Sequence, residues 1–337
     1  MKILETVKNC KRIGITGHKN PDGDCAGACC GLALFLRKAM PGVQTDVYLE
    51  PLPEALFENI PGAETILNEI PAGTEQYDAF IILDSIPERT GFAEPLFESA
   101  ALKVNIDHHK TNPGHGDVSY VDGNASSTCE MVYDVIDSEM VDREIAQALY
   151  VGIVTDTGVF QYSNTRESTM RLAGNLISYG FDFTSVIREV FFERTYMQAK
   201  MLGISLARAE RMMDGACLFC SLDNGTITRY GATRQDFEGV SAQMLLTEGV
   251  DCAVFIHETK PGEWRASMRS GNIVDVARSA SLFGGGGHTR AAGCTIYAGT
   301  GTEFAEAAKI LLADIAAQLE ADKDKDLKGQ ESSCFTE

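Results

Sequence analysis

The sequence has no run of 18 or more apolar residues, so we expect no transmembrane helix. Its first residues also lack the apolar stretch of a secretory signal, which favours a cytoplasmic protein. Basic residues are scarce, because 29 lysines and arginines face 48 acidic residues and leave a net charge of −19. A protein that coats a long nucleic-acid duplex needs a broad basic surface. Long duplexes and membranes are therefore excluded as partners, whereas short oligonucleotides and mononucleotides are retained.

The ten cysteines lack the regular spacing of a disulfide framework, and no secretory signal accompanies them. Reduced thiols are therefore expected. Cys217 and Cys220 form a CxxC pair, but they lie inside a predicted strand. With no second pair nearby, burial in a core is a better interpretation than a zinc site.

The chain is long enough for two domains, at 337 residues. In its first half, apolar strands alternate with amphipathic helices. The strands are expected at residues 12–17, 45–49, 79–84 and 103–107, and the helices at 27–37, 127–136, 144–153 and 165–178. This alternation predicts an α/β fold with a parallel sheet covered by helices on both faces.

The pattern changes in the second half, which predicts a smaller mixed α/β domain. Strands are expected at 216–222, 252–258, 264–268 and 293–297, and helices at 273–279 and 303–319. Residues 183–213 are free of proline and compatible with a helical linker. The expected organisation is a first domain at 1–182, this linker, a second domain at 214–320, and a charged, frayed tail at 321–337.

Metal-binding residue types gather where the first-half segments end. Open parallel sheets bind ligands at the carboxyl ends of their strands, so residues from separate strands are expected to meet at one rim. The segments are His18-Lys19-Asn20-Pro21-Asp22-Gly23-Asp24, Asp84, Asp107-His108-His109 and Asp156.

One such aspartate alone is usually a helix cap or a turn residue, and two adjacent histidines can be structural. When they are gathered at one rim, the negatively charged carboxylates would repel one another unless cations were bound between them. Imidazole and carboxylate ligands without a thiolate favour Mn²⁺, with Mg²⁺, Co²⁺ or Fe²⁺ as alternatives. The candidates exceed the three or four ligands that one ion needs, which indicates two ions about 3.5–4 Å apart that activate water for attack on phosphorus. No Gly-x-Ser-x-Gly or Walker-type motif offers another mechanism.

These motifs resemble those of the DHH phosphoesterases, and Gly284-Gly285-Gly286-Gly287-His288 resembles the signature of the associated DHHA1 domain. The resemblance extends from about residue 12 to 319 and is greatest to the stand-alone NrnA-type oligoribonucleases, which also hydrolyse 3′-phosphoadenosine 5′-phosphate. RecJ-like exonucleases carry further domains, and family II pyrophosphatases share only the first half. Val159 stands where some relatives have a basic residue.

The resemblance implies a role for each matching residue. His18, Asp22 and Asp84 would hold one metal, and Asp24, Asp84, His108 and Asp156 the other, with Asp84 as the bridge. His109 would contact the scissile phosphate or the attacking water, and Asp107 would orient the histidines.

The second domain would bind the rest of the substrate. The glycine run can present backbone N–H groups to an anion, although a flexible linker would look the same. His288 would contact a phosphate or a sugar, and Arg269 matches a family arginine that holds the non-scissile phosphate. His115 and His257 match no motif and are expected to be structural or exposed.

The implied activity is hydrolysis of short oligoribonucleotides to mononucleotides and of 3′-phosphoadenosine 5′-phosphate to AMP. One alternative is a phosphodiesterase acting on pApA or cyclic di-AMP, and another is a phosphatase with little ribonuclease activity. A catalytically silent nucleotide sensor is the remaining alternative, but such proteins usually lose a metal ligand and here every position is filled. Family members often pair through the first domain, although no feature of this sequence demands a homodimer.

Overall fold

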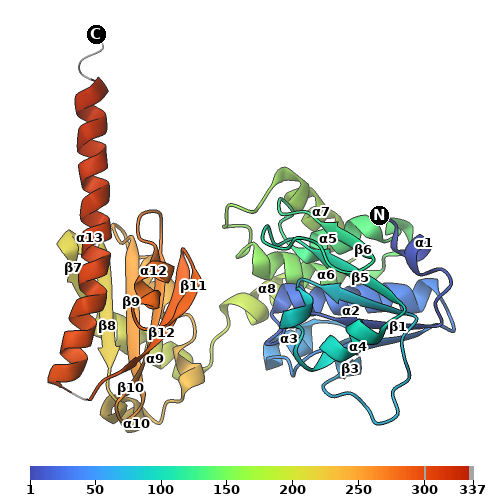
Figure 1. The fold of residues 1–337 in the computed structure, drawn as a ribbon, viewed down its shortest axis with the longest axis horizontal. Helices are drawn as coiled ribbons and strands as arrows, with labels where there is room; N and C mark the ends of the chain where they lie inside the picture. The colour runs from blue at the N-terminus through green and yellow to red at the C-terminus, as the bar shows by residue number, and fades with distance from the viewer. Residues whose placement is uncertain (300, 334–337) are drawn as a thin grey trace. The chain divides into compact units, whose positions relative to one another are not determined.

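The computed structural model describes residues 1–299 and 301–333, and side chains are described only as far as residue 323. The described chain divides into two compact units, Met1–Glu193 and Arg194–Glu337 (Figure 1). None of the described helices is long and apolar enough to cross a membrane.

The first unit is built on a six-stranded sheet in which every pairing is parallel. The strand order is β3-β2-β1-β4-β5-β6. The predicted α/β fold with a parallel sheet is therefore confirmed. The strands are β1 Arg12–Thr16, β2 Gln44–Tyr48, β3 Ile66–Leu67, β4 Ala79–Leu83, β5 Leu102–Asp107 and β6 Val118–Val121.

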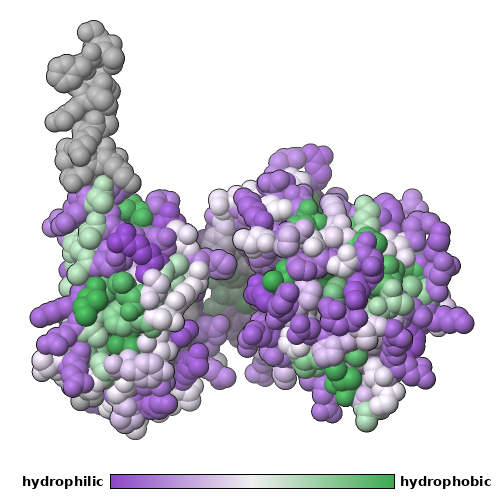
Figure 2. Space-filling model, viewed as in Figure 1, coloured by the Kyte–Doolittle hydropathy of each residue, from purple (hydrophilic) through white to green (hydrophobic). Residues whose placement is uncertain are grey.

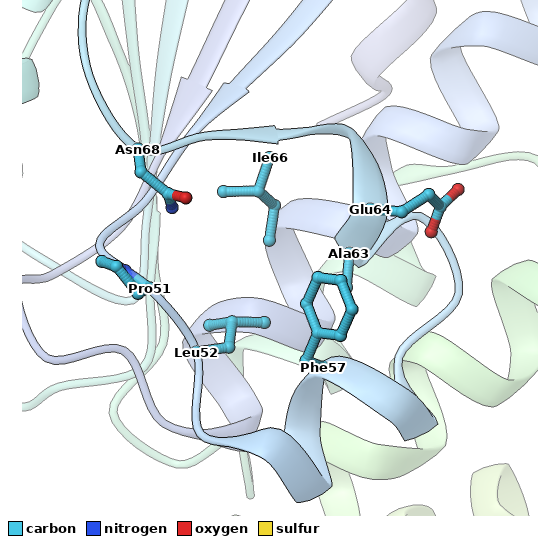
Figure 3. Close-up of a pocket in the computed structure, with 7 residues that line it drawn as sticks. All are labelled: Pro51, Leu52, Phe57, Ala63, Glu64, Ile66 and Asn68. Carbon is cyan, nitrogen blue, oxygen red and sulfur yellow. The ribbon is translucent and has the colours of Figure 1, made fainter.

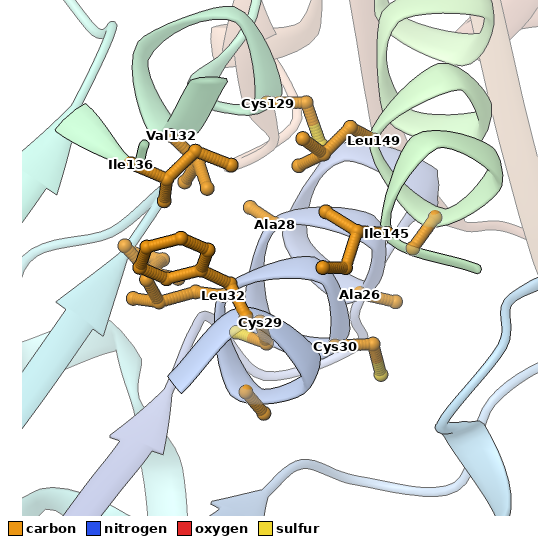
Figure 4. Close-up of a cluster of buried hydrophobic side chains, with 14 of the residues drawn as sticks. Ala26, Ala28, Cys29, Cys30, Leu32, Cys129, Val132, Ile136, Ile145 and Leu149 are labelled. Atoms are coloured by element: carbon orange, nitrogen blue, oxygen red, sulfur yellow. The ribbon is translucent and has the colours of Figure 1, made fainter. Parts of the chain in front are cut away.

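Helices cover both faces of this sheet. On one face α2 and α5 pack on alternate strand residues such as Ile81, and α6 packs on these two helices. Figure 4 shows Leu32, Val132 and Leu149 from the three helices meeting in that core. On the other face Phe80 and its aromatic neighbours pack under α4. The helices are α1 Ile3–Val7, α2 Gly23–Ala39, α3 Glu54–Asn59, α4 Glu94–Ser99, α5 Thr128–Val135, α6 Arg143–Asp156, α7 Glu167–Ile177 and α8 Phe183–Ile187.

The second unit is a mixed sheet with the order β11-β12-β10-β9-β8-β7, in which only β8 and β9 pair in parallel. Its strands are β7 Glu210–Met212, β8 Cys217–Leu222, β9 Cys252–Lys260, β10 Glu263–Ser270, β11 Gly286–His288 and β12 Ala291–Tyr297. Its helices are α9 Tyr196–Arg208, α10 Asn224–Tyr230, α11 Val240–Leu245, α12 Val276–Ser281 and α13 Thr302–Ser333.

The CxxC pair cannot hold one ion, because its two thiols lie on opposite faces of the second sheet. Residues three apart on a strand point in opposite directions. Cys217 accordingly packs in the core under α12 and α13, and Cys220 packs in the core under α9 and α11. All described cysteines are free thiols.

The predicted linker contains helices α8 and α9, but it ends in a strand, β7 Glu210–Met212, which was not expected; the described part of the tail is helical. The 183–213 segment is shared between the units, since α8 packs with α6 whereas α9 packs on β8. The tail expected to fray from residue 321 continues as helix α13 to Ser333, because charged residues of both signs are compatible with a helix as well as with a coil. Residues 334–337 of that tail lie outside the described residues.

Polar and apolar residues are mixed over the visible face of each unit, and hydrophilic ones prevail (Figure 2).

Candidate metal centre

The sequence-predicted metal ligands converge at the carboxyl end of the parallel sheet. His18 follows β1 and Asp84 follows β4 directly. Asp107 is the last residue of β5, with His108 next, and Asp156 is the last residue of α6. Asp22 and Asp24 lie at the start of α2, where the Asp22 carboxylate caps the helix by accepting the backbone N–H groups of residues 24 and 25.

Asp84 lies between two histidines and presents one oxygen to each. Its Oδ2 is 3.4 Å from His18 Nε2, and its Oδ1 is 3.5 Å from His108 Nε2. The side chain is buried, and the backbone adopts a left-handed φ of 55°, which aspartate tolerates better than most residues. Thr128 Oγ1 donates to Oδ1 at 3.1 Å. The carboxylate is thus placed as a bridge between two ligand groups.

The first ligand group contains His18, Asp22 and Asp84. His18 Nε2 lies 3.6 Å from Asp22 Oδ1, and its Nδ1 lies 3.0 Å from the Lys19 carbonyl, so Nδ1 carries the proton and Nε2 is left to face the carboxylates. The Cys25 thiol joins this group, since its Sγ and ligand atoms of His18 and Asp84 all lie within 4.8 Å of one another. The sequence predicted ligands without a thiolate, and it did not indicate that this thiol lies beside them. Burial raises the pKa of Cys25 well above its usual value.

The second ligand group contains Asp24, His108 and Asp156, and Asp84 faces it. His108 Nε2 lies 3.9 Å from Asp24 Oδ2 and 3.8 Å from Asp156 Oδ2. Asp24 is 1% exposed and accepts two backbone N–H groups at the start of α5, from Thr128 at 2.6 Å and Cys129 at 2.9 Å. The positive end of α5 therefore holds this carboxylate in place.

His109 is held by a chain of buried hydrogen bonds. Its Nδ1 lies 2.7 Å from Asp107 Oδ1, and Asn112 Nδ2 donates to Asp107 Oδ2 at 2.6 Å. Asn112 also donates to Asn105, whose own amide donates to the carbonyls of Ile82 and Ser85 on either side of Asp84. This chain fixes the tautomer of His109 with its Nε2 directed away from Asp107. The hydrogen bond to Asp107 raises the pKa of His109.

The electrostatics of the centre favour a divalent cation. Burial, together with the charges of Asp84 and Asp156, raises the pKa of Asp24 well above its usual value. Burial and the nearby Asp84 and Asp22 also raise the pKa of Asp156, to about 6, although His108 opposes this. Burial alone would lower the pKa of His18, but Asp22 and Asp84 raise it.

The spacing of the donor atoms points the same way. The imidazole–carboxylate distances of 3.4–3.9 Å are too long for hydrogen bonds. They suit donors that share an ion at roughly 2.1 Å from each. These residues fit divalent cations.

The predicted substrate-binding residues lie together in the second unit. Arg269 on β10 pairs with Ala291 on β12, which pairs with His288 on β11, so the two larger side chains flank a small one on the same face of the sheet. The second half of the glycine run is a strand rather than a flexible linker, because Gly286 and Gly287 form the edge strand β11 with His288. A Cβ at Gly287 would lie 2.4 Å from the Ala291 carbonyl, so glycine permits this close pairing.

Several supporting residues were not found from the sequence. Thr128 donates to the Asp84 carboxylate, and Asn164 donates to the Asp156 carboxylate at 3.2 Å. Asn112 donates to Asp107, and Asn105 donates to the backbone carbonyls on either side of Asp84. Only the Ser126-Ser127-Thr128 run carried a signal, that of a helix start.

A separate hollow of about 260 Å³ beyond β2 is lined by Leu52, Phe57 and neighbours, and none of the predicted site residues lines it (Figure 3).

Two family models match the chain in consecutive blocks. Residues 12–153 match the DHH family, N-terminal domain, and residues 218–319 match the DHHA1 domain. The first block spans every proposed ligand of the centre except Asp156, and the second contains Arg269 and the glycine run.

The chain is also similar over most of its length to named proteins. The bifunctional oligoribonuclease and PAP phosphatase NrnA of Bacillus subtilis is 27% identical, and the match covers 88% of this chain and 93% of that protein. The Thermus thermophilus protein of the same name is 28% identical, and the match covers 88% of this chain and 86% of that protein.

Solved structures share the fold. An exopolyphosphatase-related protein from Bacteroides fragilis superposes with a TM-score of 0.81 at 24% identity, covering 93% of this chain and 94% of its own. Exonuclease RecJ bound to manganese gives a TM-score of 0.50 at 14% identity, covering 94% and 92%.

Proposed function

Since the chain belongs to the DHH/DHHA1 phosphoesterases, which are metal-dependent hydrolases of phosphoester bonds, we propose that it hydrolyses short oligoribonucleotides to mononucleotides and 3′-phosphoadenosine 5′-phosphate to AMP. The observation that carries this proposal is the Asp84 carboxylate, whose two oxygens face His18 and His108 at 3.4 and 3.5 Å. The two similar NrnA proteins, which are named for both activities, support the choice of substrates.

The centre would hold two divalent cations. His18, Asp22 and Asp84 form one ligand set, and Asp24, Asp84, His108 and Asp156 form the other. Imidazole and carboxylate donors favour Mn²⁺, the ion bound by the similarly folded RecJ. When bound, such ions would polarise the phosphoester and supply a nucleophile near neutral pH.

The remaining residues would position the substrate. His109, fixed by Asp107 through Nδ1, would direct Nε2 at an oxygen of the scissile phosphate. In the second unit, Arg269, His288 and the N–H groups of residues 284–287 would bind another phosphate or the sugar of the nucleotide.

The first experiment is product analysis with Mn²⁺ on four substrates: 3′-phosphoadenosine 5′-phosphate, pApA, cyclic di-AMP and a 5′-labelled five-nucleotide RNA. We expect mononucleotides from the RNA and phosphate from the bisphosphate. Asp84→Asn should lose turnover on every substrate, whereas Glu88→Gln, an exposed acid four residues further on, should keep it. Strong cleavage of pApA or cyclic di-AMP with an intact pentamer would replace the proposed substrates and keep the metal chemistry.

Metal stoichiometry tests the two-ion assignment separately from activity. Calorimetric titration with Mn²⁺ should give two ions for the native chain. Asp22→Asn should weaken one binding event and Asp156→Asn the other, and Asp84→Asn should weaken both, because only Asp84 faces both groups. Equal effects of the three variants on a single event would contradict a bridging role.

A further inference from the structure

The turn that follows Asp156 has an unusual backbone. Gly158, Val159 and Phe160 all have left-handed φ values, of 56°, 55° and 65°. This conformation is expected of glycine but is an outlier for a β-branched residue such as Val159. Backbone strain of this kind persists only where the surroundings hold it, and it gathers at functional sites.

Hydrogen bonds at both ends fix this turn to the metal centre. The Val159 N–H donates to the Val154 carbonyl at 2.8 Å, and the Tyr162 N–H donates to the Thr157 carbonyl at 3.0 Å. Beyond the turn, Asn164 Nδ2 donates to the Asp156 carboxylate at 3.2 Å and to the Ser126 carbonyl at 2.8 Å. The turn therefore begins and ends at residues tied to a proposed metal ligand.

The conformation of the turn places the ring of Tyr162 over Gly158. A Cβ at Gly158 would come within 2.4–2.7 Å of three ring carbons of Tyr162, so the ring can lie against the backbone only because residue 158 has no side chain. Tyr162 is nevertheless 55% exposed. Gly158 therefore lies against the ring near Cζ, and the tyrosine as a whole remains more than half exposed.

We propose that Tyr162 is a stacking platform for the nucleobase beside the scissile phosphate. An aromatic ring held rigidly next to a phosphate-binding centre can stack on any base, since every base has a π-face. Such a platform would make the centre prefer nucleotides over phosphoesters without a base, and it would do so without selecting a base sequence. This inference rests on the proposed function, because it requires a nucleotide substrate.

Steady-state kinetics on a matched pair of substrates test the proposal. The pair is a 5′-phosphorylated dinucleotide and the same backbone with abasic sugars, each assayed with the full-length chain and Mn²⁺. For Tyr162→Ala we expect a roughly five- to hundredfold higher KM on the dinucleotide and no change on the abasic analogue. Tyr162→Phe, which keeps the ring, should match the native chain on both.

If Tyr162→Ala changes KM equally on both substrates, or changes it on neither, the platform is overturned. A purely structural role of the turn would not distinguish the two substrates. If the native chain cleaves neither substrate, the proposed function is overturned, and the platform with it. Cleavage of both by the native chain with a normal Tyr162→Ala variant would overturn the platform alone.

A second measurement uses fluorescence. A dinucleotide carrying 2-aminopurine is mixed rapidly with the protein and followed before turnover. Stacking on Tyr162 should quench the fluorescence in the native chain and in Tyr162→Phe but not in Tyr162→Ala. Equal quenching by all three would contradict the proposal.

Discussion

His257 is buried in β9 without a hydrogen-bond partner among the described residues, and its ring stacks on Phe237 and Phe255. Burial, with the charges of Arg234 and Arg265, lowers its pKa from 6.5 to about 4. The folded state therefore favours the neutral ring, and the unfolded chain takes up its proton first as the pH falls. The stability that this ring contributes is present above pH 6.5 and is lost as the pH falls towards 4.

Urea unfolding of the second unit should show this loss as a decrease of the order of 2–3 kcal/mol between pH 6.5 and 4. His257→Phe should flatten that part of the profile, because it removes the titrating group and keeps the stacked ring. His288→Gln, at an exposed position of the same unit, should leave the slope unchanged. A slope that survives in His257→Phe would assign the pH dependence to other groups.

For single residues, the sequence predicted the members of the metal centre better than it predicted the groups that hydrogen-bond to them. His18, Asp84 and His108 were found because each follows a strand, which is a local pattern. The N–H groups of residues 128 and 129 that hold Asp24 come from a helix more than a hundred positions away in the chain. No local pattern of charge or hydropathy reports such a contact.

Among the elements, α6 packs closely against α2 beside the metal centre, and this close approach requires a glycine in α6. A Cβ at Gly152 of α6 would lie 2.2 Å from Cys129 Sγ and 2.9 Å from Asp24 Oδ1. Gly152→Ala should therefore destabilise the first unit by about 1–3 kcal/mol through overpacking. It should also weaken Mn²⁺ binding, because Asp24 must move.

Gly174 of α7 is the matched control, since no described atom outside the adjoining residues and backbone of its own helix lies within 4 Å of a Cβ built there. Gly174→Ala should stabilise the unit by about 0.5–1 kcal/mol through helix propensity and keep Mn²⁺ affinity. Unfolding midpoints and calorimetric titration of both variants check this pair. Equal stability of the two would show that α6 can shift at no cost.

The long strands and helices were predicted from the sequence, and the short ones were not. Strands β1, β4 and β5 lie within a residue of their predicted bounds, because apolar residues run without a break through β4 and recur at every second position in β1 and β5. The two-residue β3 and the glycine-rich β11 carry no such pattern, and their pairing depends on neighbouring strands. Helices α10 and α11 are too short to show a clear periodicity.

For the whole molecule, the two units have separate cores, so we expect two thermal transitions. Mn²⁺ at a hundred times its dissociation constant should stabilise the transition of the first unit by about 2.7 kcal/mol per site, and a chelator should reverse this. The transition of the second unit should not move. Scanning calorimetry with and without Mn²⁺ makes the measurement.

Asp84→Asn extends this test. The variant should lose the Mn²⁺ shift, and without metal its first unit should melt at a higher temperature than the native one, because the charge of Asp84 opposes that of the buried Asp24. An unchanged melting temperature without metal would show that the free centre is not under repulsion.

The proposed ligands of the metal centre run from His18 to Asp156, and each precedes the second unit in the chain. A polypeptide that is still being synthesised therefore carries the complete ligand set once Asp156 has left the ribosome. Acquisition of metal can begin on the nascent chain, before the DHHA1 portion exists. The order of the motifs along the gene thus lets the ion help to fold the first unit while translation continues.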